Sequence, residues 1–159
     1  MAKKPLAPTP RRIASLGQVP VTRVMSPHLV CVEADLDLDT LAREMLDRSI
    51  SGCPVVDDAG GAVGFVSKTD IVAARVPGLH RRRPARAARV GGRRRTSGET
   101  KVRDIMTPVL FSVKASDSLE TAVALFARSG VHHLVVSGRA RKIVGVLSTM
   151  DVVRFLANR

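Results

Sequence analysis

The chain repeats itself with a spacing of 81 residues. A shift of this length aligns Met25 with Met106 and Asp70 with Asp151 without any gap. Fourteen of the 48 pairs between Met25 and Val72 are identical, where chance alone gives about three. A unit of this size buries too little apolar surface to be stable alone. The two copies are therefore expected to pack against each other around a shared core.

Each copy shows the same predicted order of elements, β-α-β-β-α. A short apolar strand follows each Met-x-Pro turn, and a helix follows the strand. Asp37 in one copy and Ser118 in the other can cap this helix, because their side-chain oxygens can accept from first-turn amides. Two more apolar strands and a last short helix complete the unit. The strands are expected at 29–32, 53–56, 62–66, 110–113, 134–136 and 143–147, and the last helices begin near Lys68 and Thr149.

The repeat defines the predicted domain organisation. The fold class is α/β of the α+β kind, with two β-α-β-β-α units packed by pseudo-twofold symmetry into one module. The groove between the two units is where a ligand is expected. The boundaries are a basic N-terminal tail at 1–20, the first unit at 21–74, an arginine-rich flexible linker at 75–100 and the second unit at 101–159.

The net charge of +12 is concentrated outside the patterned units. Residues 75–100 hold nine arginines against Glu99 alone, whereas residues 25–74 hold three bases against nine acids. Arginine clusters can bind nucleic-acid phosphates by counterion release, but no aromatic side chains are interleaved for base stacking. A solvated linker explains the segment equally well, and the acidic first unit could also attract it, which would concentrate anionic nucleotide near a cleft.

Several classes of protein are disfavoured by the sequence. No apolar run is long enough to cross a bilayer, and no apolar segment follows the basic N-terminus as in a secretory signal. Cys31 and Cys53 are too few for a disulfide framework or a zinc site, so a reducing cytoplasm fits best. No catalytic triad, carboxylate pair or metal-ligand cluster stands out, and no residues remain for a catalytic domain. We expect no enzymatic activity, no metal and no resident cofactor.

The last strand of each unit runs into a shared motif. It reads Gly-Phe-Val-Ser-Lys-Thr-Asp at 64–70 and Gly-Val-Leu-Ser-Thr-Met-Asp at 145–151. Together with the Met-[Ser/Thr]-Pro turns and the order of elements, this motif closely resembles the CBS domain. The resemblance implies a disc of two packed sheets with up to two clefts for AMP, ADP, ATP or S-adenosylmethionine. It also implies a regulatory role toward an unknown protein target, and a homodimer.

The serine and the aspartate of this motif have two interpretations. Ser67 and Ser148 lie where a strand meets a helix, so each hydroxyl can cap the helix or face a phosphate. Asp70 and Asp151 lie three residues further, where a carboxylate can accept from both hydroxyls of a ribose. The same spacing is that of a capping box, which is purely structural. Both interpretations stay open at this point.

A second candidate is the pair of neighbouring histidines, His132 and His133. The stretch 131–136, Val-His-His-Leu-Val-Val, resembles a segment of the gamma subunits of AMP-activated kinases, whose His and Arg contact nucleotide phosphates. His132 takes the histidine position and His133 replaces the arginine, which implies pH-dependent binding of phosphate. Because strand residues alternate, at most one of the two is expected to face a given cleft. A polar strand edge without a ligand is the alternative.

The first unit has no cation in the equivalent stretch. Gly52 would let a ligand approach the backbone closely, and Pro54 fixes the start of the strand. The resemblance also implies that polar residues on the first strand hold the base or ribose, a role that suits Ser112 better than Cys31. We expect Ser112, His132, Ser148 and Asp151 to line the better site. The whole predicted ligand-binding set is Cys31, Ser51, Gly52, Cys53, Pro54, Ser67, Asp70, Ser112, Val131, His132, His133, Leu134, Ser148 and Asp151.

The expected function is therefore a regulatory module that binds an adenine nucleotide between its two units and signals to a partner. The alternative is a nucleic-acid-associated protein that binds through residues 75–100 and uses the paired units as a scaffold.

Overall fold

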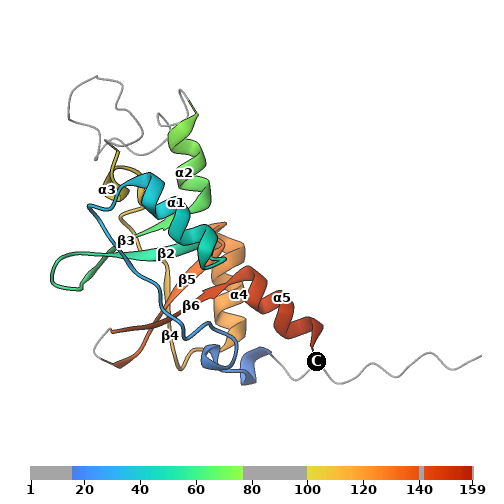
Figure 1. Ribbon diagram of the computed structural model, residues 1–159. Coiled ribbons are helices and arrows are strands. Elements are labelled where there is room, and N and C mark those ends of the chain that lie inside the picture. The colour runs from blue at the N-terminus through green and yellow to red at the C-terminus, as the bar shows by residue number, and fades with distance from the viewer. Residues whose placement is uncertain (1–15, 77–99, 140–141, 159) are drawn as a thin grey trace, which may run out of the picture.

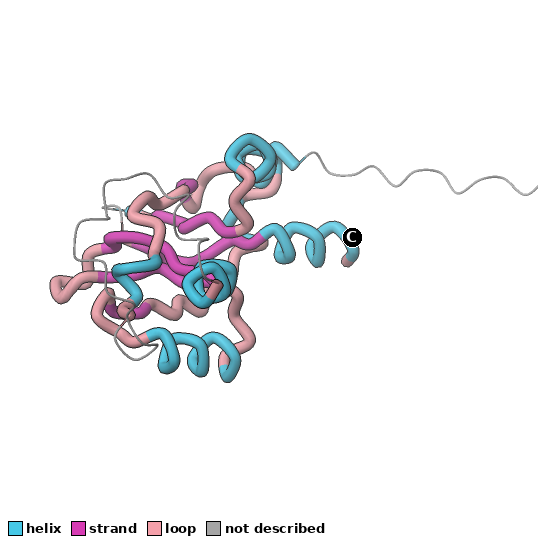
Figure 2. The backbone as a smooth tube through the Cα atoms, turned by 90° about the horizontal axis from the view of Figure 1, so that it is seen from above, coloured by secondary structure: helices cyan, strands magenta, loops and turns pink. Residues whose placement is uncertain are grey.

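The computed structural model describes residues 16–76, 100–139 and 142–158, and these residues form two three-stranded sheets, one from each repeat (Figure 1). Seen from above, the strands gather in the middle and the helices lie around them (Figure 2). The first half contains β1 (Val32–Glu33), α1 (Leu38–Asp47), β2 (Gly52–Val56), β3 (Ala62–Ser67) and α2 (Lys68–Arg75). The second half contains β4 (Ser112–Lys114), α4 (Leu119–Ser129), β5 (His133–Ser137), β6 (Ile143–Ser148) and α5 (Thr149–Ala157).

The two sheets share one topology. In each, the first strand is parallel to the second, and the second is antiparallel to the third. The register also repeats, since Val32 pairs with Val55 and Val113 pairs with Val136. The predicted fold class, a mixed α+β module of two β-α-β-β-α units, is confirmed.

The first helix of each half begins where the sequence predicts it. The Asp37 carboxylate accepts from the amides of Asp39 at 3.1 Å and Thr40 at 2.9 Å. These bonds favour the charged carboxylate, so the pKa of Asp37 is lowered. In the second half, Ser118 Oγ accepts from the amide of Thr121 at 3.2 Å. Both caps satisfy first-turn donors that have no partner within the helix.

The first strands lie further along the chain than predicted. We expected them at 29–32 and 110–113, but they are β1 and β4, at Val32–Glu33 and Ser112–Lys114. The reason is that the Met-x-Pro turns pair with the opposite half, at Ser26 with Val146 and at Thr107 with Phe65. The chain after each Met-x-Pro turn must therefore cross from the opposite half before it enters its own sheet.

A short helix ahead of each repeat packs on the other repeat, which the sequence did not reveal. These helices are η2 (Val21–Arg23), preceded by η1 (Leu16–Gln18), and α3 (Val102–Ile105). Val21 is fully buried in the second-half core with Leu119, and Val102 is fully buried in the first-half core with Leu41. Figure 1 shows the blue N-terminal segment beside α4 and the yellow α3 near α1 and α2. The two cores therefore depend on each other.

The tail and the linker are described only in part. Residues 1–15 of the predicted tail and 77–99 of the predicted linker lie outside the described residues. Within the described part of the linker, Arg75 ends α2 and forms an ion pair with Asp39 of α1. No helix within 16–76, 100–139 and 142–158 has the length and apolar character to cross a membrane.

Candidate functional site

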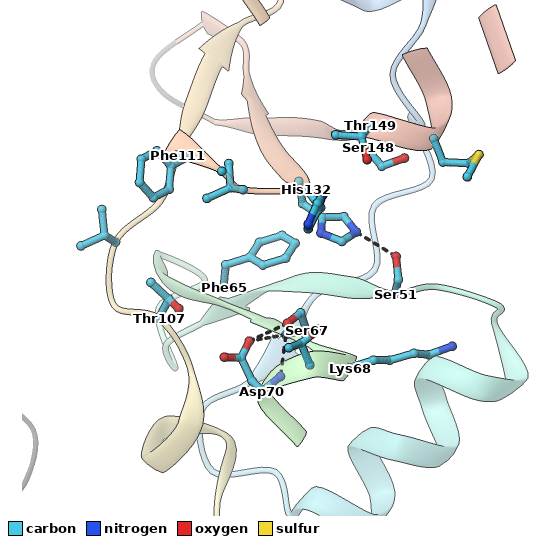
Figure 3. Close-up of a pocket in the computed structure, with 16 residues that line it drawn as sticks. Ser51, Phe65, Ser67, Lys68, Asp70, Thr107, Phe111, His132, Ser148 and Thr149 are labelled. Carbon is cyan, nitrogen blue, oxygen red and sulfur yellow. Dashed lines mark hydrogen bonds between the residues drawn. The ribbon is translucent and has the colours of Figure 1, made fainter. Parts of the chain in front are cut away.

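A cleft of about 690 Å³ lies between the two halves, and we call it the large cleft (Figure 3). Side chains from β3 and α2 form one side of it, and side chains from the start of β5 and α5 form the other. It is lined by Ser51, Phe65, Ser67, Lys68, Thr69 and Asp70 from the first half, and by Thr107, Val109, Phe111, Gly130, Val131, His132, His133, Ser148, Thr149 and Met150 from the second.

A second cleft of about 420 Å³, the small cleft, occupies the position related by the repeat. Shifting its residues by 81 positions reproduces most of the large cleft; for example, His28 corresponds to Val109 and Asp151 to Asp70. It is lined by Ser26, His28, Val30, Ser49, Ile50, Ser51, Gly52, His133, Val146, Ser148, Met150, Asp151 and Arg154.

The structure separates residues that the sequence analysis placed in one site. His132 lines the large cleft together with Asp70, whereas Asp151 lines the small cleft. Ser112 is exposed on β4 and lies outside both clefts. Each cleft takes its aspartate from one half and the residues before the middle strand from the other. The predicted grouping of His132 with Asp151 is therefore wrong, because the clefts are built across the two halves.

Both Ser-x-x-Asp motifs form complete capping boxes. Asp70 Oδ2 accepts from the Ser67 amide at 2.9 Å and from the Ser67 hydroxyl at 2.7 Å, and the Asp70 amide donates to Ser67 Oγ at 3.4 Å (Figure 3). The corresponding distances for Ser148 and Asp151 are 2.8, 2.6 and 3.2 Å. The structural interpretation of the motif is thus confirmed. Ribose contact stays a prediction, although each aspartate lines a cleft.

The small cleft carries a cation that has no counterpart in the large cleft. Arg154 lies one turn after Asp151 on α5, and its guanidinium is 3.7 Å from Asp151 Oδ1. The repeat places Ala73 at the equivalent position of the first half. The large cleft instead contains Lys68 and His132, whose counterparts are Thr149 and Ser51. The two clefts therefore differ in where positive charge is placed.

The two histidines do not alternate between clefts as predicted. Both line the large cleft, with His132 exposed and His133 half-buried. The physical reason is that β5 begins at His133, so His132 lies in a bend ahead of the strand. Its carbonyl accepts from the Thr149 amide at 3.1 Å. The alternation of side chains holds only within the strand.

His133 lies at the boundary between the two clefts and lines both. Its Nε2 is 2.8 Å from the Ser51 hydroxyl, which makes a hydrogen bond across the two halves. Its ring also stacks on Phe65, with ring centroids 5.3 Å apart and planes inclined by 29°. Burial lowers the pKa of His133, and the neighbouring His132 lowers it further. The neutral imidazole is thus favoured in this structure.

Several predicted ligand-binding residues are core residues instead. Cys53 and Leu134 are 1% and 0% exposed, and Pro54 is also fully buried. They lie on β2 and β5, the middle strands of their sheets, where side chains pack against the cores. Burial raises the pKa of Cys53 to about 12, so its thiol stays protonated. Cys31 borders a separate groove on the first half, formed with α1 residues.

The sequence analysis missed part of each cleft. Lys68 and Thr69 stand inside the Ser-x-x-Asp motif, and Val109 and Phe111 follow the second Met-x-Pro turn. His28, which is absent from the predicted ligand-binding set, lines the small cleft. The spacing of 81 residues pairs the segments after both turns, but it does not show that they line a cleft, because that position depends on their crossing onto the opposite sheets.

Comparisons with known proteins agree with this architecture. The family model for the CBS domain matches residues 21–77 and 102–158. CBSX2 of Arabidopsis thaliana, a chloroplastic CBS domain-containing protein, is 27% identical over 154 residues, which are 89% of this chain and 65% of that protein. Its solved structure in complex with AMP has a TM-score of 0.68 and 27% identity, and covers 88% of this chain and 97% of that one.

Two further proteins resemble the chain, one in its fold and one in its sequence. The CBS domain pair of protein MJ0100, solved with 5'-methylthioadenosine and S-adenosyl-L-methionine, has a TM-score of 0.71 at 16% identity, over 88% of this chain and 97% of that one. The protein MJ1404 of Methanocaldococcus jannaschii is 28% identical over 124 residues, which are 78% of this chain. This chain spans 26% of MJ1404 and 65% of CBSX2. With both repeats matched and their β-α-β-β-α units observed, the chain belongs to the CBS domain family, as a tandem pair of these domains.

Proposed function

We propose that this module binds an adenine nucleotide in the large cleft and acts as a regulatory, non-catalytic sensor. The observation that carries the proposal is the set of groups that meet in one cleft of about 690 Å³. Apolar side chains suited to a base, a carboxylate suited to a ribose and cations suited to a phosphate all line it. A cleft of this size is within the range of small-molecule sites.

The base would occupy the apolar end of the cleft. Val109 is 57% exposed and Phe111 is 36% exposed, although both are large apolar residues. Val131, which lines the same cleft, is half-buried. Exposed apolar side chains that line one concave surface favour a flat apolar ligand group such as adenine.

The ribose would meet Asp70. Its Oδ2 caps α2 through Ser67, and the residue lines the large cleft. A carboxylate can accept from both hydroxyls of a ribose. The capping bonds would also fix the orientation of the carboxylate before the ligand arrives, which lowers the entropy cost of binding.

The phosphate would lie near Lys68 and His132. Both line the large cleft, and the hydroxyls of Thr69 and Thr149 line it as well. Charge-assisted hydrogen bonds from an ammonium or imidazolium to phosphate are stronger than those between neutral groups. The first turns of α2 and α5 add the positive ends of their helix dipoles.

Two relatives support the ligand class. CBSX2 has been solved with AMP, and the domain pair of MJ0100 has been solved with 5'-methylthioadenosine and S-adenosyl-L-methionine. All three ligands contain adenosine. A ligand that contacts both halves would favour one relative orientation of the halves, and this is how we propose the signal reaches a partner protein. A cytoplasmic homodimer is part of the same proposal.

Thermal unfolding with AMP, ATP or S-adenosylmethionine tests the proposal. A ligand present at a hundred times its dissociation constant stabilises the native state by about 2.7 kcal/mol, a shift in Tm of several degrees. We expect a shift with at least one of the three, and a smaller shift in Asp70→Asn, because Asp70 lines the large cleft and not the small one. Asp104→Asn is the matched control, because Asp104 accepts from the Lys101 amide at 2.9 Å at the start of α3 and lies outside both clefts.

The outcomes separate the two functions considered for this chain. No shift with any of the three ligands contradicts the nucleotide proposal. Retention of the full shift in Asp70→Asn contradicts the assignment of the cleft. Binding of nucleic acid that weakens steeply with salt and is unaffected by Asp70→Asn would support the alternative through residues 75–100.

A further inference from the structure

The two clefts share one wall. Four residues, Ser51, His133, Ser148 and Met150, line both the large and the small cleft. Two of them come from the residues just before or at the start of β2 and β5, and two come from the junction of β6 and α5. An occupant of either cleft can therefore contact the same four side chains.

A hydrogen bond within the shared wall joins the two halves. The Ser51 hydroxyl and His133 Nε2 are 2.8 Å apart and belong to different halves (Figure 3). A ligand that takes His133 Nε2 as its own partner must break this bond, because that nitrogen offers either one proton or one lone pair.

The wall has little space in which to move. Phe65 stacks on His133, and a β-carbon on Gly52 would lie 2.6 Å from Phe65 Cε1. The backbone of Phe65 is in turn fixed by two hydrogen bonds to Thr107, of 2.9 and 2.8 Å. A displacement of the His133 ring is therefore passed to Phe65, which lines the large cleft.

We propose that the Ser51–His133 wall couples the two clefts, so that a nucleotide bound in one weakens binding in the other. This inference rests on the proposed function. It concerns which occupancies are compatible, and predicts that one nucleotide per module is the dominant liganded state.

The groups around the shared wall explain why one bound nucleotide weakens, rather than strengthens, binding of the other. An anion in the large cleft is attracted by Lys68 and His132, and an anion in the small cleft by His28 and Arg154. Among the residues that the structure describes, His133 is the one basic side chain that lines both clefts. The first ligand to bind engages the shared wall, and the second meets both an altered wall and a like charge on its far side.

Calorimetric titration with AMP measures the coupling. Asp151→Asn disables the small cleft and gives the association constant of the large one, and Asp70→Asn gives that of the small one. For independent clefts, the overall constant for two AMP molecules on the wild type equals the product of these two constants. We expect it to be at least ten-fold smaller. The same three titrations are then repeated with Ser51→Ala added to each protein. There, the overall constant should lie within about three-fold of the product of the two single-cleft constants.

Ser137→Ala is the matched control for the serine. Its hydroxyl donates to the Val113 carbonyl at 3.2 Å, away from both clefts. In this variant the overall constant should therefore remain at least ten-fold below the product. A second measurement needs no variant, because the methyl resonances of Val109 and Val30 report on the large and the small cleft in one molecule. Coupling predicts that one of them shifts in two phases as AMP is added.

Each outcome is decisive. An overall constant equal to the product, with both methyls following simple saturation, overturns the coupling and leaves the proposed function intact. Failure of Asp70→Asn to bind any AMP shows that the small cleft is no nucleotide site, which also overturns the coupling alone. Absence of AMP binding by the wild type overturns both.

Discussion

The carbonyl oxygen of Ser26 and the α-carbon of Gly145 approach so closely that a β-carbon on residue 145 would lie 2.5 Å from that oxygen. The adjacent residue, Val146, exchanges two backbone hydrogen bonds with Ser26, of 2.9 and 3.1 Å. The repeat reproduces the arrangement, since a β-carbon on Gly64 would lie 2.7 Å from the Thr107 carbonyl oxygen. The glycine of the family motif is thus required by the crossing of each turn onto the other half.

Gly145→Ala is expected to destabilise the protein by about 1–3 kcal/mol, because the new methyl group meets backbone rather than a movable side chain. Urea unfolding measures this difference. Gly61→Ala is the control. A β-carbon on residue 61 would lie 3.1 Å from the carboxylate oxygens of Asp57, an exposed side chain that can move aside. Equal stability of the two variants would show that the Ser26 crossing does not constrain residue 145.

Ile105→Ala is expected to cost about 2–5 kcal/mol, as for other large core truncations. Ile105 is 2% exposed on α3, ahead of the second repeat, yet it packs in the core of the first. Since each core contains residues from both repeats, unfolding followed by circular dichroism should remain a single transition. Val72→Ala, at a residue 62% exposed on α2, should change the stability by less than about 0.5 kcal/mol. Two separated transitions would contradict the interdependence of the halves.

The stability should also depend on pH through His133. Its pKa is lowered from the ordinary value of 6.5, first by burial and then by His132, against an opposing effect of Asp151. The unfolded chain therefore binds more protons in this range, and the free energy of unfolding rises with pH. The contribution of the neutral His133 imidazole to the free energy of unfolding is complete above pH 6.5. It is lost as the pH falls through the lowered pKa.

Urea midpoints at pH 5 and pH 7 test this dependence. His133→Gln should reduce the difference between the two midpoints, whereas His28→Gln, at an exposed residue, should leave it unchanged. Other charged groups that line the same clefts, Lys68, Asp70 and Arg154, are present in both variants and so cancel in the comparison. An unchanged difference in His133→Gln would show that the imidazole is not the group responsible.

His132→Ala is expected to weaken AMP binding about ten-fold, since a hydrogen bond to a charged group contributes about 1.5–3 kcal/mol. His28→Ala provides the comparison, since His28 lines the small cleft alone. Equal losses in the two variants at low AMP concentration would contradict the assignment of the first nucleotide to the large cleft.

The repeated part of the fold was predictable because its signals are local. The strands β2, β3, β5 and β6 follow from apolar runs bounded by turns, and α1 and α4 begin at the capping residues Asp37 and Ser118. The family motif added the Ser-x-x-Asp capping boxes at the start of α2 and α5. Each of these features depends on residues a few positions apart.

The composition of each cleft was not predictable in this way. A repeat shows that Asp70 and Asp151 are equivalent, but not which of them faces His132. That pairing depends on the crossing of Ser26 and Thr107 onto the opposite sheets, a contact between residues far apart in the sequence. The same crossing delays β1 and β4, and it places Val109 and Phe111 in the large cleft rather than in a strand.

The most direct test of the central claim is a methyl NMR titration of the wild-type protein with AMP. We predict saturable shifts of the Val109 and Val131 methyl resonances, which line the large cleft, and no shift of Leu46, which is 66% exposed on α1 outside both clefts. No saturable shift at Val109 and Val131, or shifts confined to residues outside the two clefts, would contradict the account.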